Sequence, residues 1–316
     1  MVLPPVIMRG ITFLSPAFSV AALMGLAVEK SGAALLVQES FSGYTTGTIN
    51  GQTASGTGLS GNYASSGGFS YTNTGLSFAG LATSGGAITI STTGANAVGV
   101  ALNPVGGAVT GDLFSSYLFN KPASFSTATN SLVEGRVNTS ASGDSSTASF
   151  RSQSNTDQSG NNVGVGYDAT ATAGTGAMSL NTTTYLVISK YTNVGSTLDG
   201  TTTGESFVWV LTSSQLANIR SLPGGLNEAN LNSLTVGSLS TNIFGRGSDV
   251  PVTSGTFVFD NTRFLQLAAT GSAGSTQGGT LDEFRFGTAL DDVTPVPEPS
   301  AFLLLLSAVP LLRRKR

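Results

Sequence analysis

The chain has 316 residues, of which 10% are charged, 41 are Gly, and none is Cys or His. Without Cys there is no disulfide and no thiol nucleophile. Without His the chain lacks the side chain most often used as a general base, as a transition-metal ligand and as a switch near neutral pH, so Ser/His/Asp catalysis is excluded.

The formal net charge of −3 hides an uneven distribution. Six of the 14 basic residues and two of the 17 acidic residues lie in residues 1–34 and 296–316. The remaining body has 8 basic and 15 acidic side chains, which is a net charge of −7. Such a body has no basic stripe for phosphates, and we expect no nucleic-acid partner.

Residues 1–34 have the pattern of a secretory signal peptide that signal peptidase removes. Arg9 precedes an apolar stretch from Ile11 to Val28, and the small residues Ser31–Ala34 follow. The stretch is nearly long enough to span a membrane, so an uncleaved anchor is the alternative. Pro16 and the small residues after the stretch favour cleavage.

The body shows the periodicity of β-strands, because short apolar or alternating runs stand between clusters of Gly, Asn, Ser and Thr. No spacing repeats at a fixed period, which excludes a solenoid or a calcium-binding array of repeats. The runs are Ala87–Ser91, Val98–Leu102, Leu113–Phe119, Tyr185–Ser189, Phe207–Leu211, Phe257–Phe259, Phe264–Leu267 and Leu281–Gly287.

Alternation within two of these runs predicts which side chains share a face. Phe207, Trp209 and Leu211 fall on one face of their strand and the intervening Val residues on the other, which indicates a strand central in a two-layer stack. In the last run, Phe284 and Phe286 share one face. Glu283 and Arg285 share the opposite face, where we expect them to pair in solvent.

Two further stretches depart from this pattern. One short helix is expected near Ser214–Arg220, just before Pro223-Gly224-Gly225. The stretch Thr139–Ala173 is poor in apolar residues, and we expect it to form long loops between strands.

We expect no enzyme, because the carboxylate pair that retaining glycoside hydrolysis needs does not occur on one strand. Asp282 and Glu283 are neighbours and should point to opposite faces. Asp291 and Asp292 lie in the linker that we expect after the body. A pair assembled from distant strands stays open.

Calcium is the one metal that oxygen ligands alone would serve, and no other cofactor is expected. Asp199, Asp260 and Asp282 are candidates by their position in or beside predicted strands. The alternative is that they are solvated carboxylates of turns and strand edges.

Aromatic side chains could stack on sugar rings. Trp209 lies in a strongly apolar strand, which favours a place in the core. Tyr44, Tyr63 and Tyr71 lie in Gly- and Ser-rich sequence and are the better candidates for exposed aromatic side chains.

The C-terminus combines a Pro-Glu-Pro triplet with a short apolar run and a basic cluster. The run Ala301–Leu312 has twelve residues, which as a helix span ~18 Å. The hydrocarbon core of a bilayer is ~30 Å thick, and Pro310 weakens the helix near its end, so this is a marginal span. The basic cluster holds its end on the cytoplasmic side, which predicts a short transmembrane helix.

This order of features resembles the PEP-CTERM sorting signal. The resemblance implies processing by an exosortase, a membrane-embedded Cys protease or transpeptidase, in a bacterium that makes exopolysaccharide. Pro297, Glu298 and Pro299 match the recognition triplet of that family. The matching membrane tail ends in Arg313, Arg314, Lys315 and Arg316. A plain C-terminal tail anchor is the alternative.

The body resembles the concanavalin A-like or LamG-like jelly rolls that accompany such signals. The likeness rests on Leu36–Phe41 with Gly75–Leu81, on Thr184–Lys190 before the 207–211 run, and on Leu281–Phe286. It implies an all-β fold, a two-layer β-sandwich. Domains of this type often bind one calcium ion at a loop edge.

Together these features predict a signal peptide over 1–34, a β-sandwich jelly roll over 35–290 and a PEP-CTERM sorting signal over 291–316. We expect an exported protein of the cell envelope or outer surface, transiently anchored in the inner membrane by its C-terminus. Its expected partners are signal peptidase, exosortase and a polysaccharide, without catalysis. The alternatives are an exported glycoside hydrolase-like enzyme and a purely structural envelope protein.

Overall fold

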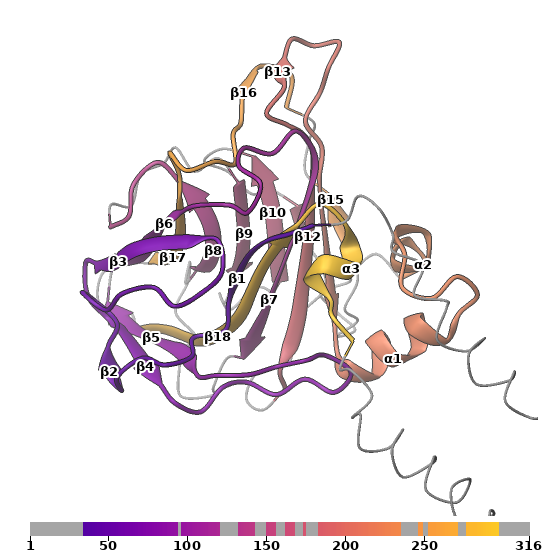
Figure 1. Cartoon of the computed structure of the whole chain (residues 1–316). Helices are drawn as coiled ribbons and strands as arrows, with labels where there is room; N and C mark the ends of the chain where they lie inside the picture. Colours follow the sequence, from indigo (N-terminus) through magenta and orange to yellow (C-terminus); the bar gives the residue numbers. More distant parts are fainter. Residues whose placement is uncertain are drawn as a thin grey trace, which may run out of the picture. The chain divides into compact units, whose positions relative to one another are not determined.

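Two antiparallel β-sheets lie face to face in the computed structural model of the chain (Figure 1). The structure describes residues 34–93, 96–120, 132–142, 150–155, 162–167, 173–174, 183–234, 246–248, 252–270 and 276–296. All of them belong to one compact unit that begins at Ala33. For these residues the predicted sandwich of two β-sheets is confirmed.

The larger described sheet has nine strands, with β1 joined to β18 beside the main row. In spatial order the row is β15 (Arg246–Ser248), β14 (Ser206–Leu211), β12 (Tyr185–Val194), β7 (Gly111–Asn120), β18 (Thr276–Gly287), β5 (Ala87–Thr93), β4 (Phe69–Thr72) and β2 (Gly47–Thr48), and β1 is Leu35–Glu39.

The smaller described sheet has seven strands. In spatial order they are β11 (Ala173–Gly174), β10 (Asn162–Tyr167), β9 (Phe150–Asn155), β8 (Leu132–Asn138), β17 (Phe264–Thr270), β6 (Asn96–Leu102) and β3 (Leu59–Ser65).

A short two-stranded arm projects beyond both sheets at the top of Figure 1. It pairs β13 (Thr197–Leu198) with β16 (Gly255–Thr256). Three helices complete the described elements: α1 (Ser213–Ser221), α2 (Glu228–Asn232) and α3 (Leu290–Val293).

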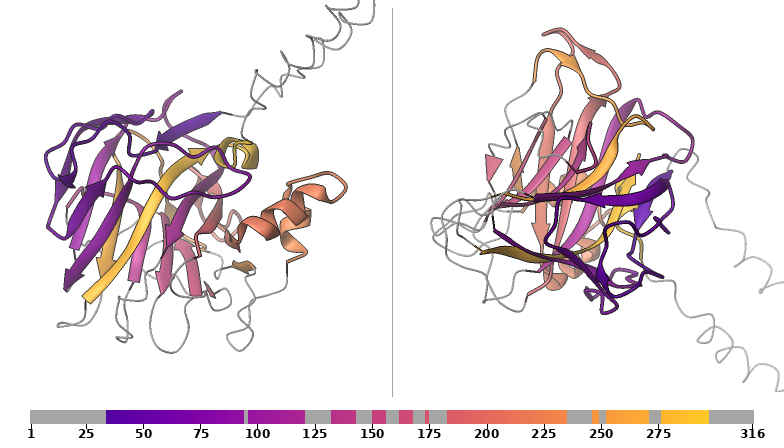
Figure 2. Two further views of the ribbon diagram at one scale, coloured as in Figure 1. Left: turned by 90° about the horizontal axis from the view of Figure 1, so that it is seen from below. Right: turned by 90° about the vertical axis from the view of Figure 1, so that its left-hand side faces the viewer.

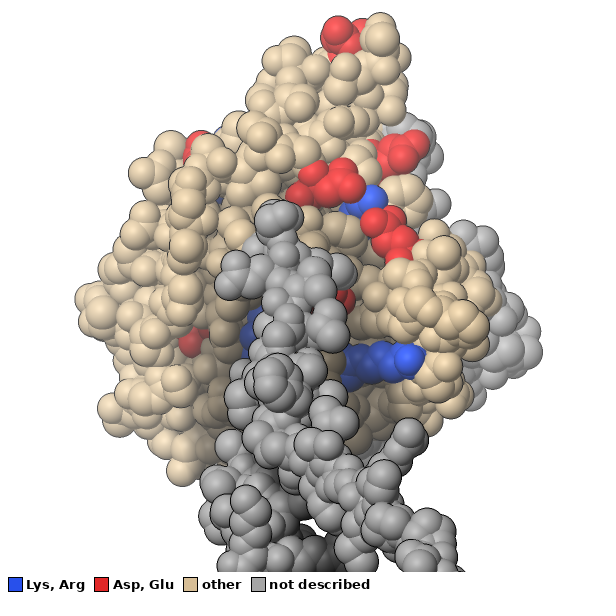
Figure 3. All heavy atoms as spheres, turned by 45° about the vertical axis from the view of Figure 1, so that its right-hand side comes forward, with Lys and Arg blue, Asp and Glu red and all other residues tan. Residues whose placement is uncertain are grey.

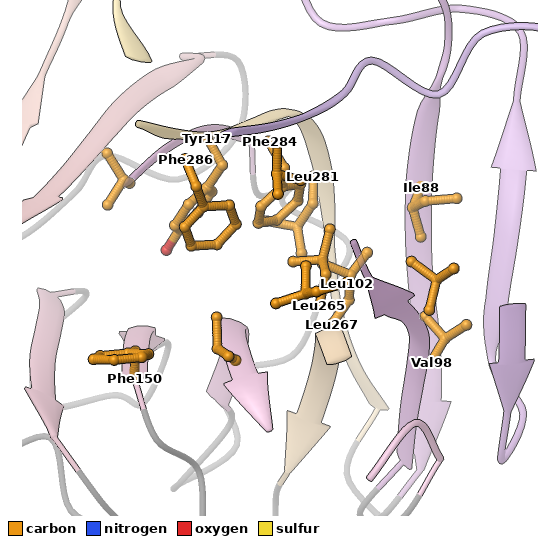
Figure 4. Packing of buried hydrophobic residues seen from close by; sticks show 14 of the residues in the cluster. Ile88, Val98, Leu102, Tyr117, Phe150, Leu265, Leu267, Leu281, Phe284 and Phe286 are labelled. Atoms are coloured by element: carbon orange, nitrogen blue, oxygen red, sulfur yellow. The ribbon is translucent and has the colours of Figure 1, made fainter. Parts of the chain in front are cut away.

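The main core lies between the sheets because alternate residues of facing strands point toward each other. Figure 4 shows Ile88, Leu281 and Phe284 of the larger sheet with Leu265 and Leu267 of the smaller one. Each is at most 1% exposed. Burying a side chain of this size stabilises the fold by about 1.5–3 kcal/mol.

A second apolar cluster covers the other face of β7, β12 and β14, so this part of the larger sheet is buried on both sides. Val208 and Val210 of β14 point into the core between the sheets, whereas Trp209 and Leu211 point into the second cluster. The predicted burial of both faces of this strand is therefore confirmed. The expectation of a central strand in a two-layer stack was wrong, because β14 lies next to β15 at one edge of the described row and a layer of helices and loops covers its second face. Figure 2 shows α1 and α2 beside the strands rather than between the sheets.

Helix α1 confirms the helix predicted near residues 214–220. Thr212 caps it, because its side chain accepts from the Gln215 N–H while the Gln215 side chain accepts from the Thr212 N–H. The buried face carries Leu216 and Ile219, which pack in the second cluster.

Two expectations about strands were wrong. The run Phe257–Phe259 forms no strand, although Phe259 is fully buried and its carbonyl accepts from the Val109 N–H. Conversely, β9, β10 and β11 lie within or at the end of the stretch expected to be loops. β9 pairs with β8, β10 with β9 and β11 with β10. Backbone hydrogen bonds between these neighbours form the strands, although the polar sequence does not predict them.

A prediction follows from the close approach of β8 to β18. A Cβ on Gly135 would lie 2.5 Å from Cε1 of Phe284, whose ring stacks on Tyr117 at 5.1 Å between centroids. We expect Gly135→Ala to lower the free energy of unfolding by about 1–3 kcal/mol, because the buried ring must shift. Denaturant titration measures this. Ser254→Ala on the exposed arm is the control, and an equal loss in both variants would contradict the prediction.

Candidate functional site

Three segments far apart in the sequence meet where the first and last described strands pair. β1 lies beside β18, and the loop of residues 75–86 is hydrogen-bonded to Phe41, two residues after β1, and to Asp282 and Glu283 of β18. Gly85 permits this approach, because it has a φ of 79° and a Cβ there would collide with the Ser40 carbonyl oxygen. We call the buried charged side chains of this junction the acidic seam: Glu39, Asp282, Glu283 and Arg285.

Glu39 lies at the end of β1 and is fully buried. Its carboxylate accepts from the Phe41 N–H at 2.7 Å, the Tyr44 hydroxyl at 2.6 Å and the Tyr63 hydroxyl at 2.8 Å. Burial raises the pKa of Glu39, and these hydrogen bonds oppose the rise. Burial and the charge of Glu39 raise the pKa of Tyr44 to about 12, so its hydroxyl remains a donor at neutral pH.

Asp282 and Glu283 were expected to point to opposite faces of their strand, and this was wrong. The register of β18 against β7 shifts between Asp282 and Arg285, and Glu283 has a φ of 53°. This bulge turns both carboxylates toward the loop of residues 75–86. Asp282 accepts from the Leu76 N–H at 2.7 Å, and Glu283 accepts from the Ser84 N–H at 2.5 Å.

Burial dominates the electrostatics of the two carboxyl groups. It raises the pKa of Asp282 to about 8, and the nearby charges of Glu283 and Glu39 act in the same direction. The Leu76 N–H opposes the rise. Burial also raises the pKa of Glu283. At neutral pH the folded protein therefore holds a proton on Asp282.

Arg285 pairs with Glu283 as predicted, but the pair does not lie in solvent. Nη2 of Arg285 is 2.9 Å from Oε2 of Glu283, and the side chains are 9% and 4% exposed. The same nitrogen donates to the Ala82 carbonyl at 3.3 Å. The loop of residues 75–86 covers this face of β18, which sequence alternation alone does not reveal.

The structure brings together acidic residues from distant strands, but it does not present them to a polymer. Asp282 and Glu39 are both 0% exposed, and their oxygens accept hydrogen bonds from surrounding backbone and tyrosine donors. A glycoside hydrolase needs two carboxyl groups on either side of a bound sugar. The acidic seam acts instead as a buried polar contact between β1, β18 and one loop.

The three calcium candidates are not brought together. Asp199 accepts from the N–H groups of Thr201 and Thr202 in the arm, and Asp260 accepts from Thr262 in a separate turn. Asp282 belongs to the acidic seam. Within the described ranges no group of three Asp or Glu side chains could hold a metal ion.

The aromatic candidates lie mostly in the core. Trp209 is 1% exposed, which confirms the core reading, and its Nε1 donates to Oδ1 of Asn232 at 3.1 Å. Tyr63 and Tyr71 were the wrong candidates for exposed rings, since they are 3% and 5% exposed. Tyr44 is half-buried, with its hydroxyl committed to Glu39.

Between the two sheets there is a cavity lined by Tyr117, Phe150 and Phe284 among others. The cavity is small: the centre of a water molecule can occupy about 10 Å³ of it, so it holds one water. A sugar ring does not fit there.

The two ends of the described body lie side by side. The Ala34 N–H donates to Oγ1 of Thr288 at 3.1 Å, and the Thr288 N–H donates to the Ala34 carbonyl at 3.2 Å. The last residue of the expected signal peptide, Ala34, is therefore hydrogen-bonded to the residue that follows β18.

Residues 290–296, which we call the docked segment, follow β18 directly. We expected Asp291 and Asp292 in a linker, and the structure places them in α3. Leu290 and Val293 of this helix are 8% and 1% exposed in the second apolar cluster. Beyond it, Val296 is 65% exposed. The described contacts of the docked segment thus reach Pro295, two residues before Pro297.

The predicted sorting residues lie outside the described residues. This applies to the signal peptide up to residue 33, to Pro297, Glu298 and Pro299, and to Arg313, Arg314, Lys315 and Arg316. Among the residues that the structure does describe, no helix is long and apolar enough to cross a membrane.

Charged side chains are few on the face of the molecule that Figure 3 shows, and most of that surface is formed by other residues. The side chain of Lys190 is mostly buried, and its Nζ lies 2.8 Å from Oδ2 of Asp112 and 2.9 Å from Oε1 of Glu228. The ion pair with Glu228 joins α2 to the larger sheet.

Comparison with solved structures found similar folds among lectins. Basic winged bean lectin with Tn-antigen is 10% identical, and the match covers 81% of this chain and 98% of that one at a TM-score of 0.45. Lectin II from Ulex europaeus is 10% identical, with 73% and 94% covered and a TM-score of 0.40. A protein of unknown function from Shewanella oneidensis MR-1 is 16% identical, with 92% and 100% covered and a TM-score of 0.40.

All of these TM-scores are below 0.5, so the likeness supports no statement about a ligand. The assignment of a β-sandwich is based on the two described sheets and not on these comparisons. Comparisons of the sequence with protein-family models and with curated proteins found no match.

A pH dependence follows from the acidic seam. The folded pKa of Asp282 is about 8 and its usual value is 3.8, so the folded state binds the extra proton between these values. This stabilisation is complete below pH 3.8 and is lost as the pH rises through about 8. We expect the free energy of unfolding to fall with rising pH between 5 and 8, by up to about 1.4 kcal/mol per pH unit for one proton.

Asp282→Asn should flatten this slope, because the side chain no longer titrates. The matched control is Asp199→Asn, since backbone hydrogen bonds lower the pKa of that exposed group and it titrates below the window. Chemical denaturation of both variants and the wild type at several pH values provides the measurement. An unchanged slope in Asp282→Asn would show that this group stays ionised in the folded state.

Proposed function

We propose that the chain is an exported cell-surface protein, that an exosortase processes its C-terminus, and that its body is a concanavalin A-like jelly roll that associates with carbohydrate without catalysis. The observation that carries the proposal is the order of features at the C-terminus: the triplet Pro297-Glu298-Pro299, the apolar run 301–312 and the basic cluster 313–316.

The positions of the described elements are compatible with both cuts. Every described strand and helix lies between Leu35 and Val293. A signal peptidase cut near residue 34 would leave β1 paired with β18, and an exosortase cut near Pro297 would leave α3 in place. Processing at both ends therefore needs no loss of a described element from the sandwich.

The C-terminal sequence has the physical asymmetry that sorting needs. The apolar run partitions into the membrane but is marginal as a permanent span, and the basic cluster keeps its end in the cytoplasm. The triplet then lies at the outer face of the inner membrane. Cleavage breaks one peptide bond near the triplet: the tail keeps the new amino group, and the carbonyl of the body passes to water or to an acceptor amine.

The body offers hydroxyl and amide groups rather than charge for recognition. Only 10% of the residues are charged, and the exposed residues of the projecting arm include Thr197, Thr253, Ser254 and Thr256. Such groups donate and accept hydrogen bonds with sugar hydroxyls. The body's net charge of −7 disfavours anionic polymers, so a neutral polysaccharide is the preferred class of partner.

The absence of catalysis is proposed on the chemistry of the described carboxylates. The acidic residues that the fold gathers, Glu39, Asp282 and Glu283, are buried and hydrogen-bonded within the protein. The runner-up function, a hydrolase, requires two carboxyl groups on either side of a bound sugar. The exposed carboxylates of Asp112 and Glu228 are both bound to Nζ of Lys190, at 2.8 Å and 2.9 Å.

Sorting is tested in the full chain expressed in a host that has an exosortase. We expect mass spectrometry of the wild-type product to show loss of residues at both ends. Glu298→Ala should retain the C-terminal tail and remain in the inner-membrane fraction, because the recognition triplet is broken. Glu205→Ala, which removes an exposed acidic side chain elsewhere, should be processed like the wild type. A mature wild-type protein with both ends intact would rule the sorting proposal out.

Carbohydrate association is tested separately with the mature protein on arrays of neutral and anionic polysaccharides. We expect retention on neutral polymers and at least several-fold weaker retention on anionic ones, because of the acidic body. Release of reducing sugar from any of these polymers would instead support the hydrolase. No retention on any polymer would favour the purely structural alternative.

A further inference from the structure

Apolar contacts hold the docked segment against the larger sheet. Val293 and Leu290 lie in the second apolar cluster together with Leu118 of β7 and Ile219 of α1. Only 1% of Val293 is exposed. A four-residue helix has little stability of its own, so α3 exists because the body holds it.

Polar contacts fasten the backbone of the same segment. The Ser116 hydroxyl donates to the Val293 carbonyl at 2.5 Å, and Nη2 of Arg220 donates to the Thr294 carbonyl at 2.9 Å. The Ala82 N–H donates to the Pro295 carbonyl at 3.3 Å. Three successive carbonyl groups of the docked segment are thus hydrogen-bonded to three different elements of the body: β7, α1 and the loop of residues 75–86.

Among the described residues, the last carbonyl held in this way is that of Pro295, two residues before Pro297. Val296 follows Pro295 and is 65% exposed, and residue 297 begins the triplet. One free residue spans at most about 3.6 Å. Release of all seven residues of the docked segment would add about 25 Å of extended chain.

A protease needs its substrate extended on both sides of the bond that it cuts, and a folded body next to that bond obstructs it. We propose that the docked segment is a latch, and that its release from the body limits the rate at which the exosortase cuts near the triplet. This inference rests on the proposed function, since it assumes that the triplet is the sorting signal.

The latch acts through a local opening equilibrium. When opening and closing are fast compared with cutting, the rate follows the population of the open form. The opening breaks the contacts of residues 290–296 and leaves both sheets folded, so it is distinct from global unfolding. Each weakened contact raises the open population and with it the rate of cleavage.

The test measures the loss of the C-terminal tail after a pulse of synthesis of the full chain in an exosortase-positive host. Val293→Ala weakens the apolar anchor, and Arg220→Ala removes the bond to Thr294. We expect each to speed cleavage by on the order of 10-fold. The matched control is Val208→Ala, which removes the same atoms from the core between the sheets, and its rate should equal that of the wild type.

A spacer variant bypasses the latch. Eight Gly and Ser residues inserted between Val296 and Pro297 supply free chain without undocking. We expect this variant to be cut as fast as Val293→Ala, and we expect Val293→Ala to give no further gain when combined with the spacer.

The outcomes separate the latch from the sorting proposal. Equal rates in the wild type, Val293→Ala, Arg220→Ala and the spacer variant would overturn the latch and leave sorting intact. Slower cleavage in Val293→Ala, or equal acceleration by Val208→Ala, would also overturn it. No cleavage in any variant, the spacer variant included, would overturn the sorting proposal itself.

Discussion

The pairing of β18 with β1, β5 and β7 is the interaction on which the rest of the structure depends. Through it the last long strand joins the two halves of the larger sheet and brings the start of the body next to its end. The aromatic side chains of β18 fill the core between the sheets, and Asp282, Glu283 and Arg285 of the same strand form the acidic seam with Glu39 of β1. The chain then turns directly into the docked segment.

Burying charge in a protein without disulfides is costly, and the local geometry reduces that cost. Desolvation opposes ionisation of Glu39 and Asp282 and raises the pKa of both carboxyl groups. Hydrogen-bond donors around each group offset part of this cost. The raised pKa of Asp282 favours its protonated form at neutral pH. The bulge at Glu283 makes this possible, because it directs two neighbouring acidic side chains toward the same loop. The acidic seam therefore holds the loop of residues 75–86 at the place where β1 pairs with β18.

The layer outside the larger sheet connects the fold to the proposed function. It combines α1, α2 and α3 with a loop that also covers the acidic seam, and Arg220 reaches from α1 to the loop and to the docked segment. The segment that precedes the Pro-Glu-Pro triplet is consequently part of the folded body rather than a tether. In the proposed latch, the contacts that stabilise this part of the body are the ones that release would break.

Local patterns in the sequence were enough to predict the class of fold, the helix near residues 214–220 and the two-sided burial of Phe207–Leu211, because alternation, capping and apolar content are local properties of the chain. The proposed signals at both ends are likewise predicted from the sequence alone, by the order of their apolar, basic and proline residues. Three features became visible only in the folded protein: the place of polar β9 and β10, the burial of Tyr63, Tyr71 and the Glu283–Arg285 pair, and the docking of residues 290–295. The reason is that strand pairing, a bulge and a covering loop come from partners far away in the sequence, and local patterns do not record them.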